Sequence, residues 1–143
     1  IALAGEEIEK AFILNLKIDR SQVEAAKRDI GLIKRKGNES LFESLSPLVS
    51  VIKDEAAKQA AYWASQNEDD KKNDKISKII LCGGESTLAG LPEFLSYELK
   101  MRVELGNPWV NAVSFEDYIP EIEMRDSLAY STAIGLALRQ WIN

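Results

Sequence analysis

The residues best suited to ligand chemistry lie in the segment 79–95, IILCGGESTLAGLPEFL. An apolar run leads into Gly83 and Gly84, which precede small polar residues and then a helix-forming stretch. Glycines at a strand end let the backbone approach a ligand without a clashing Cβ, and open α/β sheets bind ligands at the carboxyl ends of strands. The pattern therefore indicates a ligand loop, although any tight turn from strand to helix can use it. The phosphate-loop and GxGxxG spacings are both absent.

The composition excludes several kinds of chemistry. The 143 residues contain no histidine, which removes Ser-His-Asp and Cys-His catalysis. The single cysteine, Cys82, excludes an internal disulfide and a multi-cysteine metal site, and we interpret it as a small apolar residue on a buried strand. A net charge of −5 disfavours binding to nucleic acid, which needs clustered basic residues. No apolar run approaches the roughly 18 residues that span a membrane.

The glycine segment must be positioned by the elements around it, and these predict an α/β domain. Residues 76–82 predict a strand covered on both faces, because residues 79–81 are all apolar. A helix over 92–100 and a second strand over 102–105 follow. A strand, a helix and a strand at this spacing favour at least one parallel pair. Asp126 is expected to cap a final helix that runs to about Trp141 and packs closely through its small residues.

The first 31 residues predict two helices. Residues 1–4 are interpreted as the end of a strand, which a glycine terminates before a helix over 6–16. A second helix is expected to begin at Ser21, because Ser21 and Glu24 have the spacing of a capping box. It should end at Gly31, since glycine tolerates a positive φ angle.

The middle of the chain predicts a loop over 32–43 and then a long helix. We expect this helix to begin near Pro47, which suits a first helical turn, and to end near residue 66. Its inward stripe is predicted to contain Leu48, Val51, Ile52, Ala56, Ala60 and Trp63. The polar residues 67–75 predict a short solvated linker.

Three segments resemble the actin, Hsp70 and MreB superfamily. The glycine segment is similar to its adenosine-binding loop, through Gly83, Gly84, Leu88, Gly90 and Leu91. The opening IALAGEEIEKAF resembles a strand followed by an acidic helix start. The segment VEAAKRDIG, residues 23–31, is similar to a helix that presents a glutamate and a lysine beside adenine and ribose; the matching positions are Glu24 and Lys27.

Within this superfamily the sequence resembles the PilM family of type IV pilus assembly proteins. The resemblance rests on GLPEFLSYELKMRVELGNPWVN, residues 90–111, and on SLAYSTAIGLALR, residues 127–139. It implies that nucleotide is bound by Glu24, Lys27, Gly83, Gly84, Glu85 and Ser86. Relatives often have glycine where this chain has Glu85. No catalytic residue and no metal ligand is implied.

The resemblance also implies a fold and a role. The fold would be lobe II of the actin-like ATPase (ribonuclease H-like) fold, a partial sheet flanked by helices. Residues 5–45 would form the small IIB-like subdomain, and residues 1–4 and 46–143 the large IIA-like one. The full-length protein would bind ATP as Mg-ATP with little or no turnover, and it would dock a PilN-like membrane protein tail and other platform proteins. It would be cytoplasmic and reach the inner membrane through partners.

Because phosphate-binding loops and the metal-positioning aspartate lie in the preceding half of such proteins, this segment alone is expected to lack ATPase activity. Three alternatives remain open at this point. An actin-fold kinase or Hsp70-like hydrolase would need catalytic acids from that other half. An FtsA-like division protein would end in an amphipathic membrane helix, which this sequence does not show. A structural module without a ligand is the third.

Overall fold

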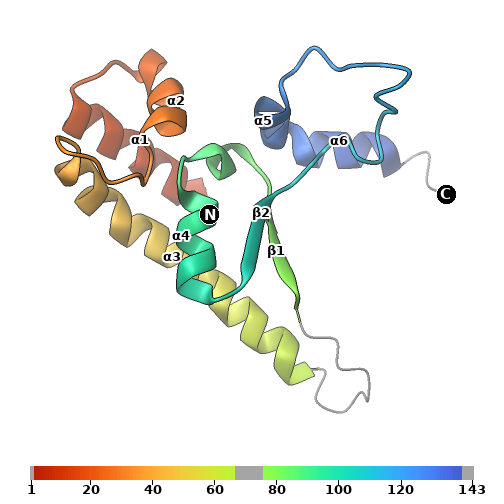
Figure 1. Ribbon diagram of the computed structural model, residues 1–143, viewed down its shortest axis with the longest axis horizontal. Coiled ribbons are helices and arrows are strands. Elements are labelled where there is room, and N and C mark those ends of the chain that lie inside the picture. Colours follow the sequence, from red (N-terminus) through yellow and green to blue (C-terminus); the bar gives the residue numbers. More distant parts are fainter. Residues whose placement is uncertain (1, 67–75, 140–143) are drawn as a thin grey trace.

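The computed structural model describes residues 2–66 and 76–139, which form a mixed α/β fold (Figure 1). The predicted linker and Trp141 lie outside these residues. In chain order the elements are α1 (Ala2–Leu16), α2 (Arg20–Asp29), α3 (Glu39–Gln66), β1 (Lys78–Leu81), the 3-10 turn η1 (Gly84–Thr87), α4 (Leu91–Leu99), β2 (Arg102–Leu105), α5 (Met124–Ser127), the 3-10 turn η2 (Leu128–Tyr130) and α6 (Ser131–Leu138).

The two strands confirm the predicted parallel pair. β1 pairs with β2 in the register Ile79 to Val103 and Leu81 to Leu105. α4 lies between them in the chain and contacts β2, as a crossover helix must in a parallel β-α-β unit. The predicted bounds of β2 are correct, and those of α4 are correct to within one residue.

The prediction that β1 is covered on both faces is wrong. Leu81 and Val103 pack against the core, but Ile80, on the opposite face, is 52% exposed. Alternate side chains of a strand point to opposite faces, and the outer face of this pair carries an ion pair between Lys78 and Glu104. The described helices therefore cover only the face that Leu81 and Val103 share. The strand is also shorter than predicted, so that Cys82 lies beyond it and is exposed.

The hydrophobic core joins the first three helices to α4. Its buried members are Ile8, Ala11, Phe12, Val23, Leu32, Leu41, Leu45, Val49, Leu88, Leu91 and Leu95. Figure 1 shows α1 and α2 together at one end of α3, with α4 between α3 and the strands. The predicted boundary between subdomains, at residues 45 and 46, falls inside α3, and that division stays a prediction.

The start of α1 corrects the predicted strand. Ala2, Leu3 and Ala4 belong to the helix, which continues through Gly5 instead of ending there. Alanine and leucine have the strongest intrinsic helix preference, so they extend a helix that already buries Ile8 and Phe12.

The start of α2 lies at Arg20, with Asp19 as its N-cap. The predicted capping box of Ser21 and Glu24 is wrong by two positions, because Asp19 and Gln22 form it: the Asp19 N–H donates to Gln22 Oε1 at 3.0 Å. Aspartate and serine are about equally good caps, and the cap at Asp19 adds Arg20 and Ser21 to the helix. The cap correction leaves Glu24 available for other contacts. The predicted end of α2 is confirmed, since Gly31 has a φ of +47°.

The long helix begins earlier than predicted. α3 starts at Glu39, which leaves Pro47 inside it and shortens the predicted loop. An interior proline costs a helix about 3 kcal/mol. Leu41, Leu45 and Val49 are fully buried on one stripe, and each contributes roughly 1.5–3 kcal/mol. Burial on both sides of Pro47 therefore outweighs the lost hydrogen bond.

The predicted inward stripe of α3 is only partly correct. Leu48 and Ile52 pack against the core. Val51 and Trp63, in contrast, are both more than half exposed. The buried stripe is shifted toward the N-terminal half of the helix, because α1 and α4 contact α3 there.

The C-terminal helices also differ from the prediction. Asp126 lies inside the short helix α5 and does not cap a longer one. Its carboxylate forms an ion pair with Arg28 instead. The predicted close packing of the last helix is wrong for its described residues, since α6 contains no buried residue and Leu136 is 61% exposed.

Candidate functional site

The glycine loop after β1 is held by its own hydrogen bonds. Gly83 has a φ of +100°, a conformation that favours glycine. The hydroxyls of Ser86 and Thr87 donate to the carbonyls of Gly83 and Gly84. The Gly83 N–H donates to the Leu128 carbonyl at 2.9 Å, so this N–H is not open to a ligand. The loop is therefore a fixed turn that is hydrogen-bonded to η2.

The C-terminal end of α2 docks directly on the residues that follow this loop. The Ala89 N–H donates to the Lys27 carbonyl at 2.9 Å, and Ala89 in turn accepts from the Leu32 N–H at 2.8 Å. A Cβ on Gly31 would lie 2.3 Å from the Ala89 oxygen, which is far inside contact distance. The glycine thus permits a close backbone approach that fixes α2 beside the loop.

Lys27 joins α2 to the loop through two ion pairs that its buried ammonium forms with partly exposed carboxylates. Its ammonium lies 3.0 Å from Glu24 Oε1 and 3.0 Å from Glu85 Oε1, and its side chain is only 2% exposed. Burial acts to lower the pKa of Lys27, but hydrogen bonds and attraction from Glu85 and Glu24 outweigh it and raise the pKa above 10.5. Lys27 is therefore a fixed positive charge at neutral pH.

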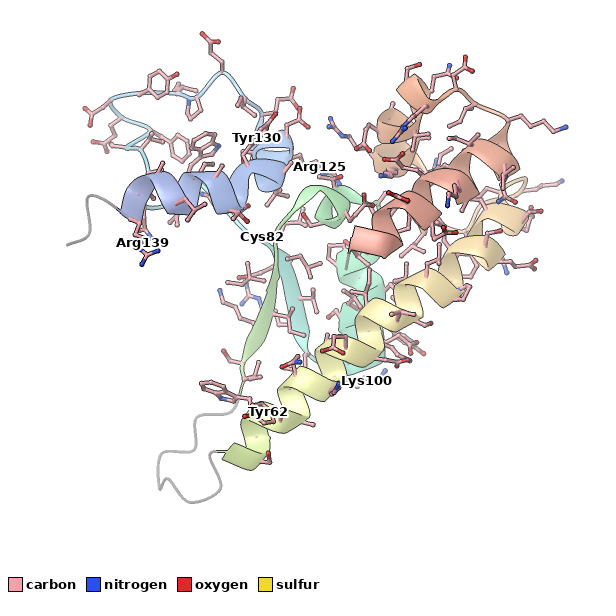
Figure 2. All side chains as sticks on the ribbon, turned by 180° about the vertical axis from the view of Figure 1, so that it is seen from behind. Tyr62, Cys82, Lys100, Arg125, Tyr130 and Arg139 are labelled. Carbon is pink, nitrogen blue, oxygen red and sulfur yellow. The ribbon has the colours of Figure 1, made fainter. Side chains whose placement is uncertain are left out.

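A hollow of about 470 Å³ opens between α2 and α5, and we call it the α2–α5 hollow. Glu24 and Arg28 line it from α2, Gly84 and Thr87 from η1, and residues from Glu121 to Tyr130 line the opposite side. Figure 2 shows Arg125 and Tyr130 at the end of the C-terminal helices nearest α2, with Arg139 at the far end of α6. The volume lies within the range of small-molecule sites.

The charges around this hollow are mostly negative. Four carboxylates and two guanidiniums line it, namely Glu24, Glu121, Glu123, Asp126, Arg28 and Arg125. Arg28 is paired with Asp126. The Nε of Arg28 is buried and lacks a hydrogen-bond partner among the described residues. Carboxylates accept hydrogen bonds from hydroxyl and amino groups and repel phosphates. The lining therefore suits the uncharged, hydroxyl-bearing end of a ligand.

A second hollow of about 670 Å³ lies between α2 and the start of α4, and we call it the α2–α4 hollow. Leu32, Ile33 and Phe94 contribute apolar walls, and Ser86 lines it too. Arg28 and Arg125 line both hollows, so the two spaces share one wall.

The structure distributes the six predicted nucleotide residues over different surroundings. Glu24 and Gly84 line the α2–α5 hollow, while Ser86 is buried beside the α2–α4 hollow. Lys27 and Glu85 bind each other, so α2 and the glycine loop are in direct contact.

Sequence reasoning did not name Arg28, Thr87, Asp126 or Tyr130 as site residues, although all four line the α2–α5 hollow. One signal could have found Arg28. It lies four residues after Glu24 on the same helix, so the two side chains share a face. Nothing local marks Asp126, which is 98 residues from its partner Arg28.

Two further observations bound the chemistry. In the part of the chain that the structure describes, no three Cys, Asp or Glu side chains gather as a metal site would require. Each helix over residues 2–66 and 76–139 is too short or too polar to cross a bilayer.

Comparison with known proteins identifies the family. A family model described as "Type IV pilus assembly protein PilM" matches residues 2–141. The chain belongs to the PilM family. Its fold is similar to that of a solved structure titled "PilM-PilN type IV pilus biogenesis complex", with 23% sequence identity between the two chains and a TM-score of 0.65. That match covers 94% of this chain and 36% of the solved chain, so the PilM-family segment spans about a third of it. No curated protein matches the segment.

Proposed function

We propose that this chain supplies the nucleoside-binding part of a PilM-type scaffold for type IV pilus assembly. In this proposal it corresponds to lobe II of the actin-like ATPase (ribonuclease H-like) fold, with residues 5–45 as the small subdomain. The observation that carries it is the direct contact of α2 with the glycine loop, through Lys27 and Glu85. Two segments 58 residues apart, both predicted to bind nucleotide, thereby meet at one place.

The α2–α5 hollow fits the nucleoside end of ATP better than its phosphates. Glu24 can accept a hydrogen bond from a ribose hydroxyl, and Arg28 offers a planar guanidinium on which a base can stack. Because carboxylates outnumber guanidiniums around the hollow and repel phosphates, the triphosphate would have to be held by residues outside this chain. ATP bound to both sets of residues would stabilise the arrangement in which the phosphate-binding residues lie against the hollow.

The partner in this proposal is a PilN-like membrane protein, as in the complex named in the matched structure. The protein would work on the cytoplasmic side of the inner membrane together with other platform proteins. Nucleotide binding would close two lobes on each other, and closure would alter the surface that partners meet. ATP would then act by favouring one arrangement, with little or no turnover.

The variant Gly84→Val tests the proposed site. A Cβ at Gly84 would meet only the Ala129 Cβ, at 4.0 Å, so the fold has room for a side chain that projects into the hollow. Calorimetric titration of the complete protein with Mg-ATP and with adenosine should show the affinity for both lost in this variant. Gly135→Val is the matched control, because a Cβ there meets nothing within 4 Å and Gly135 lies in α6. Unchanged affinity in Gly84→Val would refute the proposed site.

This chain by itself should bind ATP in the millimolar range or not at all, because it lacks the strong charge-assisted phosphate contacts. It should release no phosphate from Mg-ATP. Steady turnover by the purified chain would show that it contains a complete catalytic site, contrary to the proposal.

A further inference from the structure

Lys27 is the predicted nucleotide residue that a ligand cannot reach in this structure. Its side chain is 2% exposed, and two carboxylate oxygens lie 3.0 Å from its ammonium. Lys27 is absent from the lining of the α2–α5 hollow, although Glu24 and Arg28 on the same helix are part of it. Any ligand that contacts this ammonium must therefore first displace one of the two carboxylates.

We propose that Glu85 is an internal competitor for Lys27, whose carboxylate occupies the place that an oxygen of the ligand would take. This inference rests on the proposed function and names how its site is regulated. In the free protein, Glu85 satisfies the buried ammonium. A bound nucleoside replaces the contact between Glu85 and Lys27 with one of its own. The measured affinity for the nucleoside is therefore lowered by the free energy needed to move the Glu85 carboxylate away.

The geometry selects Glu85, and not Glu24, as the group that leaves. Glu24 lies three residues from Lys27 on the same helix, so its contact is local to α2. Glu85 reaches across from η1, a separate segment, and its second carboxylate oxygen is buried without a hydrogen-bond partner among the described residues. A buried oxygen without a hydrogen-bond partner raises the energy of the conformation in which Glu85 binds Lys27. The Glu85 carboxylate thus has an unfavourable term in this position that the Glu24 carboxylate, which is 57% exposed, does not have.

Gly5 provides the space in which the Glu85 carboxylate lies. A Cβ on Gly5 would lie 3.2 Å from Glu85 Oε1, the same oxygen that binds Lys27. Such a contact is tighter than ordinary packing, so an alanine there would push the carboxylate by a few tenths of an ångström. Gly5 is in a helix, where alanine is favoured over glycine. Gly5→Ala therefore weakens the Lys27–Glu85 contact without endangering the fold.

The test compares nucleoside affinity with stability in the absence of ligand. Glu85→Gln removes the negative charge of the acceptor, so that the Lys27 ammonium donates to a neutral amide oxygen and its contact with residue 85 weakens. Adenosine and Mg-ATP should therefore bind the complete protein about tenfold more tightly. The melting temperature without ligand should fall, because a buried ammonium loses one of its two counter-charges. Gly5→Ala should also raise affinity, by a smaller factor. Glu104→Gln, which removes a surface ion pair on β2, is the control and should leave affinity unchanged.

The expected rise in nucleoside affinity, together with the fall in melting temperature, distinguishes competition by Glu85 from a role in positioning Lys27. If Glu85 only held Lys27 in place, both Glu85→Gln and Gly5→Ala would bind adenosine more weakly. That result, or equal affinity in all variants, would overturn the inference while leaving the proposed function standing. If neither the wild type nor either variant bound adenosine or Mg-ATP, both the inference and the proposed function would fail.

Discussion

The helices α1 to α4 and the C-terminal helices α5 and α6 differ in how their apolar residues are used. α2 has the sequence RSQVEAAKRD and is strongly polar, yet Val23 is buried in the core. α6 has the sequence STAIGLAL and is mostly apolar, yet none of its residues is buried. α6 contacts η2, whereas α1 contacts both α2 and α3. Burial therefore follows from the neighbours that surround a helix, and not from its apolar content.

The largest expected effect tests the buried side of this comparison. Phe12 is fully buried in the core, and Phe12→Ala should lower the free energy of unfolding by about 3–5 kcal/mol. Leu14→Ala is the matched control, since Leu14 lies on the same helix and is 76% exposed. Urea denaturation of both variants measures the difference. Similar losses in the two variants would contradict the core described above.

The second prediction concerns a contact inside the well-packed region, between the end of α2 and the residues that follow the glycine loop. Gly31→Ala places a Cβ against the Ala89 backbone in a left-handed conformation, so it should cost about 2 kcal/mol or more and loosen α2 from the loop. Gly37→Ala has a positive φ too, but its Cβ would meet nothing within 4 Å. The difference between the two unfolding free energies isolates the contact with Ala89. If the variants are equally destabilised, that contact contributes nothing.

A smaller effect should appear at alkaline pH. The folded state raises the pKa of Lys27 above 10.5, so it holds this proton more tightly than the unfolded chain does. The resulting stabilisation is complete below about pH 10.5 and is lost as the pH rises through the folded-state pKa. Unfolding free energies between pH 8 and about 12 should fall more steeply for the wild type than for Lys27→Met. Parallel curves would mean that the ion pairs of Lys27 do not favour the bound proton.

The smallest expected effect tests the exposed side of the comparison. Leu136→Ala should change the unfolding free energy by less than about 0.5 kcal/mol, because Leu136 is mostly exposed and leaves no cavity. A loss of 2 kcal/mol or more, measured by the same denaturation, would show that α6 is packed in solution and would remove the contrast with α1.

The sequence predicts elements well where their signals are local. The bounds of β2 and the end of α2 at Gly31 depend on a few adjacent residues, and both are confirmed. The start of α3 was missed because Pro47 is a local signal that burial of Leu41 and Leu45 overrides. The glycine loop and the Glu24–Lys27 pair can be identified as candidate site residues from the sequence alone.

The partners of these residues could not be named in the same way. Glu85 lies 58 residues from Lys27, and Asp126 lies 98 residues from Arg28. Charges of either sign are common along the chain, and only the packing of α2 on the loop selects these pairs. The shape of the candidate site is thus a tertiary property, while its residue types are a sequence property.

The shared wall of the two hollows has a thermodynamic consequence. Arg28 and Arg125 line both spaces, so a ligand that shifts either guanidinium on one side changes the shape and charge of the other side. Linkage requires the effect to be reciprocal: if occupancy of the α2–α5 hollow strengthens binding in the α2–α4 hollow by some factor, the reverse holds by the same factor. Through these two guanidiniums, a ligand bound in one hollow would change the affinity for a ligand in the other.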